Sequence, residues 1–102
     1  MIKILPLAEF AAQIEKPNVQ LLDVRTEMEY NLGKINDALL INVQSPDFED
    51  QVKESVDFNQ PIYLYCRSGV RSQVAASILE GLGAGEVYDL EGGYLNWVLK
   101  NK

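Results

Sequence analysis

Short apolar runs of strand length alternate with helical patterns along almost the whole chain, and this alternation constrains the fold more than any other feature. Several runs are rich in β-branched and aromatic residues, as strands are, and the segments between them have room for a helix. Strands connected in this way build a mostly parallel sheet with helices on both faces. The sequence therefore predicts an α/β fold, with strands over residues 2–5, 20–24, 38–43, 61–65 and 86–90.

Apolar residues at helical spacing indicate three of the connecting helices. Their apolar faces are Leu7, Phe10, Ala11 and Ile14; Phe48, Val52 and Val56; and Val74, Ala75, Ile78, Leu79 and Leu82. Thr26 with Glu29 has the pattern of a capping box, and Ser45 before Pro46 that of an N-cap and first turn. Gly83 is expected to end the third helix.

The chain length, net charge and residue counts favour one compact cytoplasmic domain. At 102 residues the chain is long enough to bury a hydrophobic core, and Pro6 and Glu9 interrupt the apolar start before a signal peptide or membrane span could form. The net charge of −6 argues against nucleic acid and anionic membranes as partners. The single cysteine fits a reducing compartment, and the absence of histidine excludes imidazole-based metal sites and Cys-His catalytic pairs, so we expect no metal and no cofactor.

That single cysteine, Cys66, follows a strand and precedes a helix in the stretch "YLYCRSGVRS". Ligands of parallel sheets bind at such places, because loop amides and the positive end of the helix dipole can surround an anion. Gly69 permits the unusual backbone conformation that such a loop needs, and Ser68 and Ser72 supply hydroxyls. A free cysteine is often only a small buried hydrophobe, but two arginines, a glycine and two hydroxyls beside this one favour a reactive thiolate.

Three segments resemble the rhodanese-like single-domain sulfurtransferases. "CRSGVRS" resembles their active-site loop, Cys-Arg-x-Gly-x-Arg followed by Ser, and "EGGYLNW" resembles their Gly-Gly-x-x-x-Trp. "LLDVRTEMEYNLGKINDALLINV" resembles their N-terminal segment, except that Lys34 replaces a common His and Asp37 a common Gly. The resemblance implies one rhodanese-like domain over residues 1–102, a three-layer α/β/α fold with a five-stranded, mostly parallel central sheet. The two departures affect the expected shape of the turn between Gly33 and Ala38.

The resemblance also implies a reaction. Cys66 would attack the outer sulfur of a donor such as thiosulfate, release sulfite and carry the sulfur as a persulfide to a thiol, a thioredoxin-like protein or cyanide. The substrate would be held by the loop residues Arg67, Ser68, Gly69, Val70, Arg71 and Ser72. Arg67 or Arg71 would attract the dianionic donor and steady the departing sulfite, with the alternative that one of the two pairs inward instead. Asp23, Arg25 and Glu29 are expected to support the loop.

Three other functions remain open from the sequence. Cysteine-dependent phosphatases share this fold and cradle an anion beside a thiolate, although they have one more residue between Cys and Arg than the four found here. A non-enzymatic interaction or regulatory module of the same fold is a second alternative, and a protein-to-protein sulfur relay is a third. We also expect Tyr63, Tyr65 and Trp97 to pack in the core and the Gly92-Gly93 pair to form a tight turn.

Overall fold

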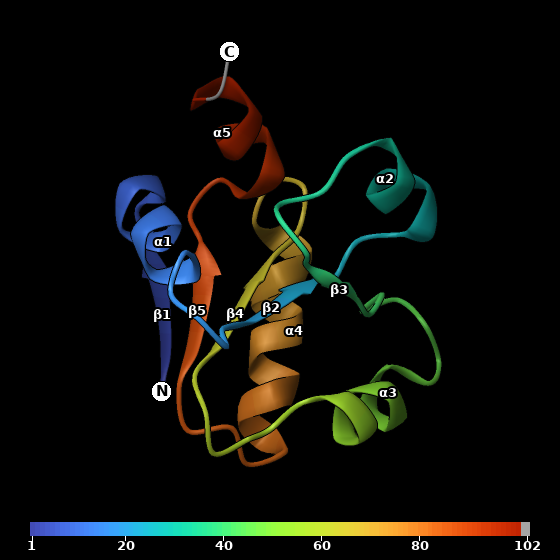
Figure 1. Cartoon of the computed structure of the whole chain (residues 1–102). Helices are drawn as coiled ribbons and strands as arrows, with labels where there is room; N and C mark the ends of the chain where they lie inside the picture. Colours follow the sequence, from blue (N-terminus) through green and yellow to red (C-terminus); the bar gives the residue numbers. More distant parts are fainter. Residues whose placement is uncertain (101–102) are drawn as a thin grey trace.

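The computed structural model describes residues 1–100, and these form one five-stranded parallel sheet with helices between the strands (Figure 1). The strands lie side by side in the order β1-β5-β4-β2-β3. The strands are β1 (Ile2–Leu5), β2 (Gln20–Asp23), β3 (Leu39–Leu40), β4 (Ile62–Tyr65) and β5 (Val87–Leu90). The helices are α1 (Leu7–Ile14), α2 (Glu27–Leu32), α3 (Phe48–Ser55), α4 (Val70–Gly81) and α5 (Gly93–Lys100). The α/β class and the parallel sheet are thus as predicted.

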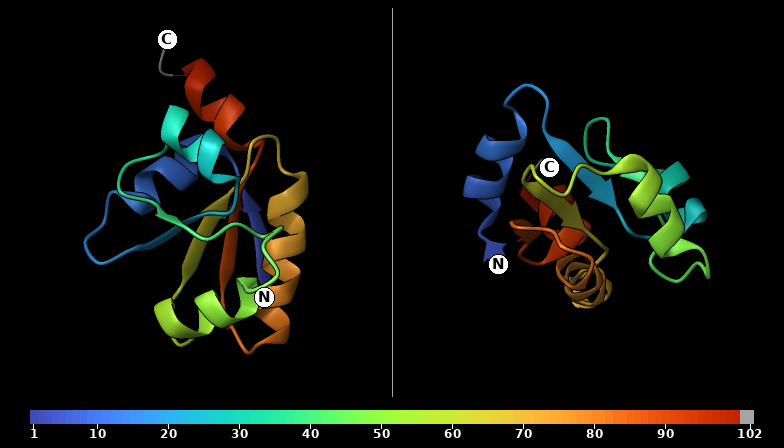
Figure 2. Two further views of the ribbon diagram at one scale, coloured as in Figure 1. Left: turned by 90° about the vertical axis from the view of Figure 1, so that its right-hand side faces the viewer. Right: turned by 90° about the horizontal axis from the view of Figure 1, so that it is seen from below.

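Two hydrophobic cores lie on the two faces of the sheet, which gives three layers (Figure 2). On one face α3 and α4 pack against inward-facing residues of the central strands, including Leu22 and Leu64. On the other face α1 and α5 cover a core that contains Phe10 and Tyr65. Because β4 is buried along its whole length in the middle of the sheet, the residue that follows it starts from a rigid position.

The predicted helix ends were right at α2 and α4 and wrong at α3. Thr26 and Glu29 form the expected capping box, and Gly83 (φ 111°) follows the end of α4 in a left-handed conformation. Ser45 is not an N-cap, because its hydroxyl bonds the side chain of Asp47 and the helix begins only at Phe48. The apolar face of α4 is also shifted from the prediction, since Val74 is 54% exposed.

The edge strand β3 is much shorter than the expected strand over residues 38–43. Its pairing with β2 is regular only at Leu39 and Leu40. Ile41 and Val43 still donate backbone hydrogen bonds to Asp23 and Val24, but the chain then turns at residues 43–45 toward α3. Apolar β-branched residues therefore mark a segment that follows the sheet edge without extending the regular ladder.

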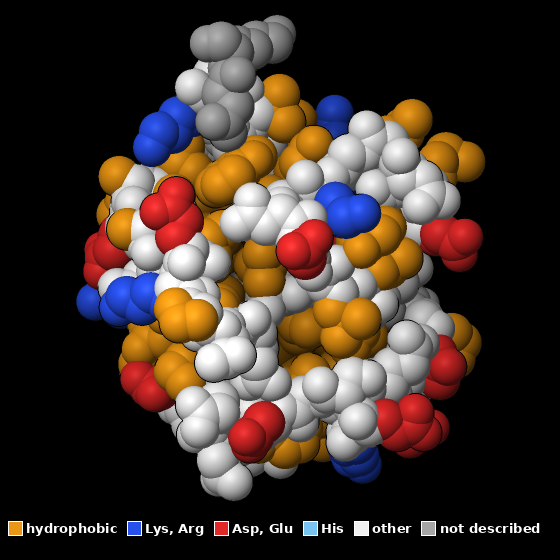
Figure 3. Space-filling model, viewed as in Figure 1, with side chains coloured by type: hydrophobic (Ala, Val, Ile, Leu, Met, Phe, Trp, Pro, Cys, Tyr) orange, Lys and Arg blue, Asp and Glu red, His pale blue; other side chains and the backbone are white. Residues whose placement is uncertain are grey.

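The surface carries many acidic side chains with apolar areas between them (Figure 3). A cavity of about 670 Å³ opens beside β2, β3 and the end of α3, at the opposite end of the sheet from Cys66. Leu39 contributes to its apolar wall, and Asn36 and Ser55 contribute polar groups. Within residues 1–100 no helix has the length and apolar character that crossing a membrane requires.

Candidate active site

Cys66 directly follows β4 and begins the loop that leads to α4, at the carboxyl end of the sheet (Figure 1). Its Sγ accepts a hydrogen bond from the backbone N–H of Gly69 at 3.0 Å and donates one to Ser72 Oγ at 3.3 Å. Gly69 has φ 111° and occupies the N-cap of α4, a conformation that favours glycine. The sulfur is thus held near the positive end of a helix, with a backbone donor aimed at it.

The loop residues differ strongly in exposure. Cys66 and Ser72 are buried, whereas the residues between them that reach the surface or its edge are Arg67, Ser68, Gly69, Val70 and Arg71. The structure therefore brings together all seven residues that the sequence singled out in this loop. The Cys66 sulfur is thus buried, and charged and polar groups of the same loop lie at the surface.

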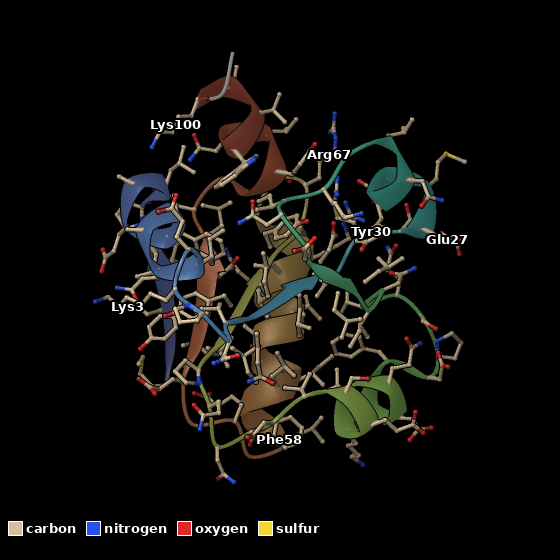
Figure 4. All side chains as sticks on the ribbon, in the orientation of Figure 1. Lys3, Glu27, Tyr30, Phe58, Arg67 and Lys100 are labelled. Carbon is tan, nitrogen blue, oxygen red and sulfur yellow. The ribbon has the colours of Figure 1, made fainter. Side chains whose placement is uncertain are left out.

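The two loop arginines have different surroundings. Arg71 donates two hydrogen bonds to the Glu29 carboxylate, at 2.6 and 2.9 Å, and Glu29 is held in turn by Thr26. The hydrogen bond from Arg71, with a further one from the Thr26 backbone, lowers the pKa of Glu29 to about 2 although burial opposes the shift. Arg67 is exposed and makes no ion pair within residues 1–100 (Figure 4). Arg71 is thus the arginine that pairs inward, and Arg67 is the one exposed at the surface.

Asp23, Arg25 and Glu29 were expected to support the loop. Glu29 is the carboxylate that holds a loop arginine, while Asp23 and Arg25 form a buried ion pair with each other at 2.6 Å. Arg25 also donates to the Gly33 carbonyl at 2.6 Å, and Tyr65 Oη donates to Asp23 at 2.7 Å. Burial acts to lower the pKa of Arg25, and the hydrogen bond and charge of Asp23 outweigh it and raise that pKa.

The Gly92-Gly93 turn supports the base of the loop, a role that sequence reasoning missed. The backbone N–H of Tyr94 donates to the Cys66 carbonyl at 2.8 Å, and that of Leu95 to the Arg67 carbonyl at 3.0 Å. Gly93 has φ 61°, and a Cβ there would lie 2.6 Å from the Cys66 carbonyl oxygen. The glycine pair was the available signal, but its partner in space is not readable from one sequence.

An apolar groove of about 520 Å³ lies beside the loop, between α2 and α5. Leu32, Leu95 and Leu99 form much of its wall, and Leu32 and Leu99 are 86% and 70% exposed. Arg67 is the lining residue that also belongs to the Cys66 loop. Arg25 and Glu29 also line the groove, so a molecule in it would contact an apolar surface with charged groups beside the Cys66 loop.

The turn that carries the two departures from the family pattern is ordered by local contacts. Lys34 Nζ lies 4.8 Å from the centre of the Tyr30 ring, and the backbone N–H of Ile35 donates to Tyr65 Oη at 3.0 Å. Asn36 adopts a left-handed conformation with φ 46°, and Asp37 is exposed. Neither replaced residue is among those that line the groove beside the Cys66 loop.

Comparisons with known proteins agree with this geometry. The chain is 32% identical over 94 residues to a tRNA uridine(34) hydroxylase of Teredinibacter turnerae, which covers 89% of this chain but only 29% of that protein. It is 37% identical to the YqhL protein of Bacillus subtilis, covering 95% of this chain and 73% of YqhL. The crystal structure of a rhodanese-like domain protein from Staphylococcus aureus superposes with a TM-score of 0.82 and 32% identity, covering 93% of this chain and 90% of that one.

The chain spans less than a third of the tRNA uridine(34) hydroxylases that it matches, so the likeness to them concerns one part of those proteins. YqhL and the staphylococcal protein match over most of their lengths. The sequence pattern of the Rhodanese-like domain matches residues 6–100. These residues include all five helices, the Cys66 loop and every strand except β1. The chain belongs to the rhodanese-like domain family.

Proposed function

We propose that this protein is a sulfurtransferase that moves a sulfane sulfur from a donor such as thiosulfate to an acceptor through a Cys66 persulfide. The Cys66 sulfur attacks the outer sulfur of the donor, and the donor's S–S bond breaks with its electron pair leaving on sulfite. An acceptor nucleophile then attacks the outer sulfur of the persulfide, and the electron pair returns to Cys66.

The observation that carries this proposal is the contact of the Gly69 N–H with Cys66 Sγ at the N-terminus of α4. Amides and a helix dipole fixed around a sulfur stabilise negative charge on it and on a sulfur added to it. Arg67, exposed beside them, attracts a dianionic donor and the departing sulfite. Thus one small loop provides the nucleophile, the anion site and the cation.

The size of the loop favours sulfur over phosphate. Four residues separate Cys66 from Arg71, and Arg71 is turned away into its ion pair with Glu29. A phosphoryl group surrounds its phosphorus with oxygens and needs several donors at once, whereas a sulfane sulfur is a single exposed atom. The phosphatase alternative is therefore the less favoured of the two enzymatic functions.

The acceptor comes from outside the chain, because no second cysteine is present to resolve the persulfide as a disulfide. The apolar groove beside Arg67 suits a thiol carried on an apolar or protein surface, such as a thioredoxin-like protein, and cyanide and small thiols need no groove. The tRNA of the hydroxylase relatives is disfavoured as a substrate by the net charge of −6. The same single free thiol makes the reducing cytoplasm the proposed location.

The test is to incubate the protein with thiosulfate, remove the donor and measure the intact mass. We expect one added sulfur on Cys66, its loss on adding cyanide or a thiol, and no added sulfur on Cys66→Ser. Arg67→Ala should load more slowly at low thiosulfate, because it removes the exposed cation. Hydrolysis of an aryl phosphate that depends on Cys66, with no sulfur added from thiosulfate, would replace this proposal with the phosphatase. Retention of tRNA on the protein would instead reinstate nucleic acid as a partner.

A further inference from the structure

The walls of the apolar groove between α2 and α5 belong to neither hydrophobic core. Leu95, Val98 and Leu99 lie at helical spacing on α5, and Leu32 at the end of α2 lines the same groove. Within residues 1–100 none of these four side chains packs into the cores on the two faces of the sheet, and Leu32 and Leu99 are largely exposed. Exposed apolar side chains gathered in one concave place are typical of a binding site.

Tyr94 connects the two sides of the groove. The Arg25 guanidinium lies 4.3 Å from the centre of the Tyr94 ring. The Tyr94 hydroxyl reaches Gly33 after α2, where an added Cβ would collide with it. The backbone N–H of Leu95 donates to the Arg67 carbonyl at 3.0 Å, which ties the Cys66 loop to α5. The groove is thus built on contacts between α5, the end of α2 and the Cys66 loop.

Arg67 carries the one charge of the groove that has no ion-pair partner within residues 1–100. Of the other two charged lining residues, Arg25 pairs with Asp23 at 2.6 Å. Glu29 pairs with Arg71, also at 2.6 Å. Arg67 is exposed and lies between α2 and α5 (Figure 4). The groove therefore combines apolar walls with a single uncompensated positive charge, in a chain whose net charge is −6.

We propose that this groove binds a small amphipathic organic anion, with its apolar body between Leu32 and Leu99 and its anionic head on Arg67. The groove volume of about 520 Å³ is within the range of small-molecule sites, which combine apolar walls with a few polar groups. A carboxylate or sulfonate head forms charge-assisted hydrogen bonds with a guanidinium. A neutral apolar molecule leaves Arg67 unpaired and a short anion leaves the walls exposed, so both parts of the ligand are needed.

A ligand in the groove competes with the sulfur donor, and this consequence rests on the proposed function. Arg67 is the cation proposed to attract thiosulfate, so an anion already bound to it raises the thiosulfate concentration needed to load Cys66. The maximum loading rate is unchanged, because saturating donor displaces the ligand. The ligand also excludes an acceptor that approaches through the groove, whereas cyanide needs no groove.

The test titrates the protein with octanoate in a calorimeter, with acetate and octanol as matched probes. Acetate keeps the charge without the chain, and octanol keeps the chain without the charge. We expect octanoate to bind at one site, about tenfold or more tightly than either matched probe. Arg67→Ala should weaken octanoate binding about fivefold and leave octanol binding unchanged, because it removes only the charge.

Two further variants locate the site on the protein surface. Leu99→Asp should abolish octanoate binding, because it places a carboxylate in the apolar wall. Leu39→Asp is the matched control, since Leu39 is also apolar and exposed but lines the cavity at the opposite end of the sheet. It should bind octanoate as wild type does. In the thiosulfate loading assay, octanoate should raise the half-saturating thiosulfate concentration of wild type and not that of Leu99→Asp.

Equal octanoate binding by wild type and Leu99→Asp, or octanol binding as tight as that of octanoate, would overturn the inference. A failure of octanoate to bind would also overturn it, and a dimer in solution that Leu99→Asp dissociates would then assign the groove to a second copy of the chain. The titration requires no sulfur transfer, so its result is independent of the proposed function. Octanoate binding without any persulfide from thiosulfate would support the anion site and reject the sulfurtransferase. Persulfide formation without octanoate binding would do the reverse.

Discussion

Asp23 and Asp89 are both buried on strands that flank β4, yet their surroundings differ in almost every respect. Asp23 is 0% exposed and accepts hydrogen bonds from the Arg25 guanidinium, the Arg25 backbone and Tyr65 Oη. Asp89 is 1% exposed and leaves Oδ1 without a donor. One carboxylate is surrounded by compensating groups, and the other has a buried oxygen that no donor reaches.

The difference separates a compensated buried charge from an uncompensated one. Charges that are buried with full compensation hold neighbouring segments in place, and Asp23 through Arg25 reaches the Gly33 carbonyl and the Tyr94 ring, 4.3 Å away. A carboxylate buried without compensation destabilises the fold when it is ionised. The two aspartates are therefore expected to respond to the same substitution in opposite directions.

Asp23→Asn should give the largest effect on stability. It leaves the buried Arg25 guanidinium without a counter-charge, and breaking a buried pair in this way costs about 3–5 kcal/mol. Urea unfolding near neutral pH measures the loss, and Asp50→Asn on the exposed side of α3 should stay within about 0.5 kcal/mol of wild type. A loss below about 1 kcal/mol for Asp23→Asn would show that water compensates Arg25 and would remove the contrast with Asp89.

Asp89→Asn should instead stabilise the protein at neutral pH. Because burial raises the pKa of Asp89 from 3.8 to about 6, the wild type loses stability as the pH rises through that interval. The neutral variant is spared this loss, and we expect a gain of about 1–3 kcal/mol near pH 7 that disappears below about pH 4. Urea unfolding at both pH values measures it. A variant that is less stable than wild type at pH 7 would make Asp89 a second structural charge.

Most of the fold was predictable from the sequence because it depends on local patterns. The alternation of strands and helices, the capping box at Thr26 and the stop at Gly83 each depend on residues close together in the chain. The errors arose where a distant segment decides the outcome. β3 is short because the chain leaves the sheet edge toward α3, and Val74 is exposed because α4 turns Ser72, two positions earlier, toward the sheet.

The Cys66 loop was predictable for the same reason, since all its chemistry lies within seven consecutive residues. Its supports were not, because each comes from another element. Glu29 lies 42 positions before Arg71 in the chain, and the Gly93 turn, which follows β5, approaches the Cys66 carbonyl. Asp89 carried no signal in the sequence, because a polar residue in a strand is usually exposed and only the folded chain shows that it is buried.

The smallest effect on stability is expected for Glu29→Gln. Like Asp23, Glu29 is a carboxylate paired with an arginine, but it lies near the surface. Its ion pair with Arg71 leaves both side chains about a quarter exposed, and pairs of this kind contribute about 1 kcal/mol or less. Glutamine preserves the capping box with Thr26, so the substitution removes the ion pair and leaves the helix cap. Urea unfolding should show a correspondingly small loss.

The pH dependence of that small loss identifies its cause. The Arg71 hydrogen bond lowers the pKa of Glu29 from 4.5 to about 2, so its stabilisation is fully present above about pH 4.5 and declines as the pH falls toward 2. Wild type and Glu29→Gln should therefore differ at neutral pH and converge in acid, with the wild type the more stable of the two, whereas for Asp89 the variant is the more stable. Concentrated salt should narrow the gap, because a partly exposed pair is screened. Glu27→Gln, exposed in the first turn of the same helix, controls for the helix dipole. If both variants lost the same free energy of unfolding, the effect would belong to the helix dipole and not to the Arg71 ion pair. The stability contributed by a carboxylate here would then depend on its exposure more than on its charged partner.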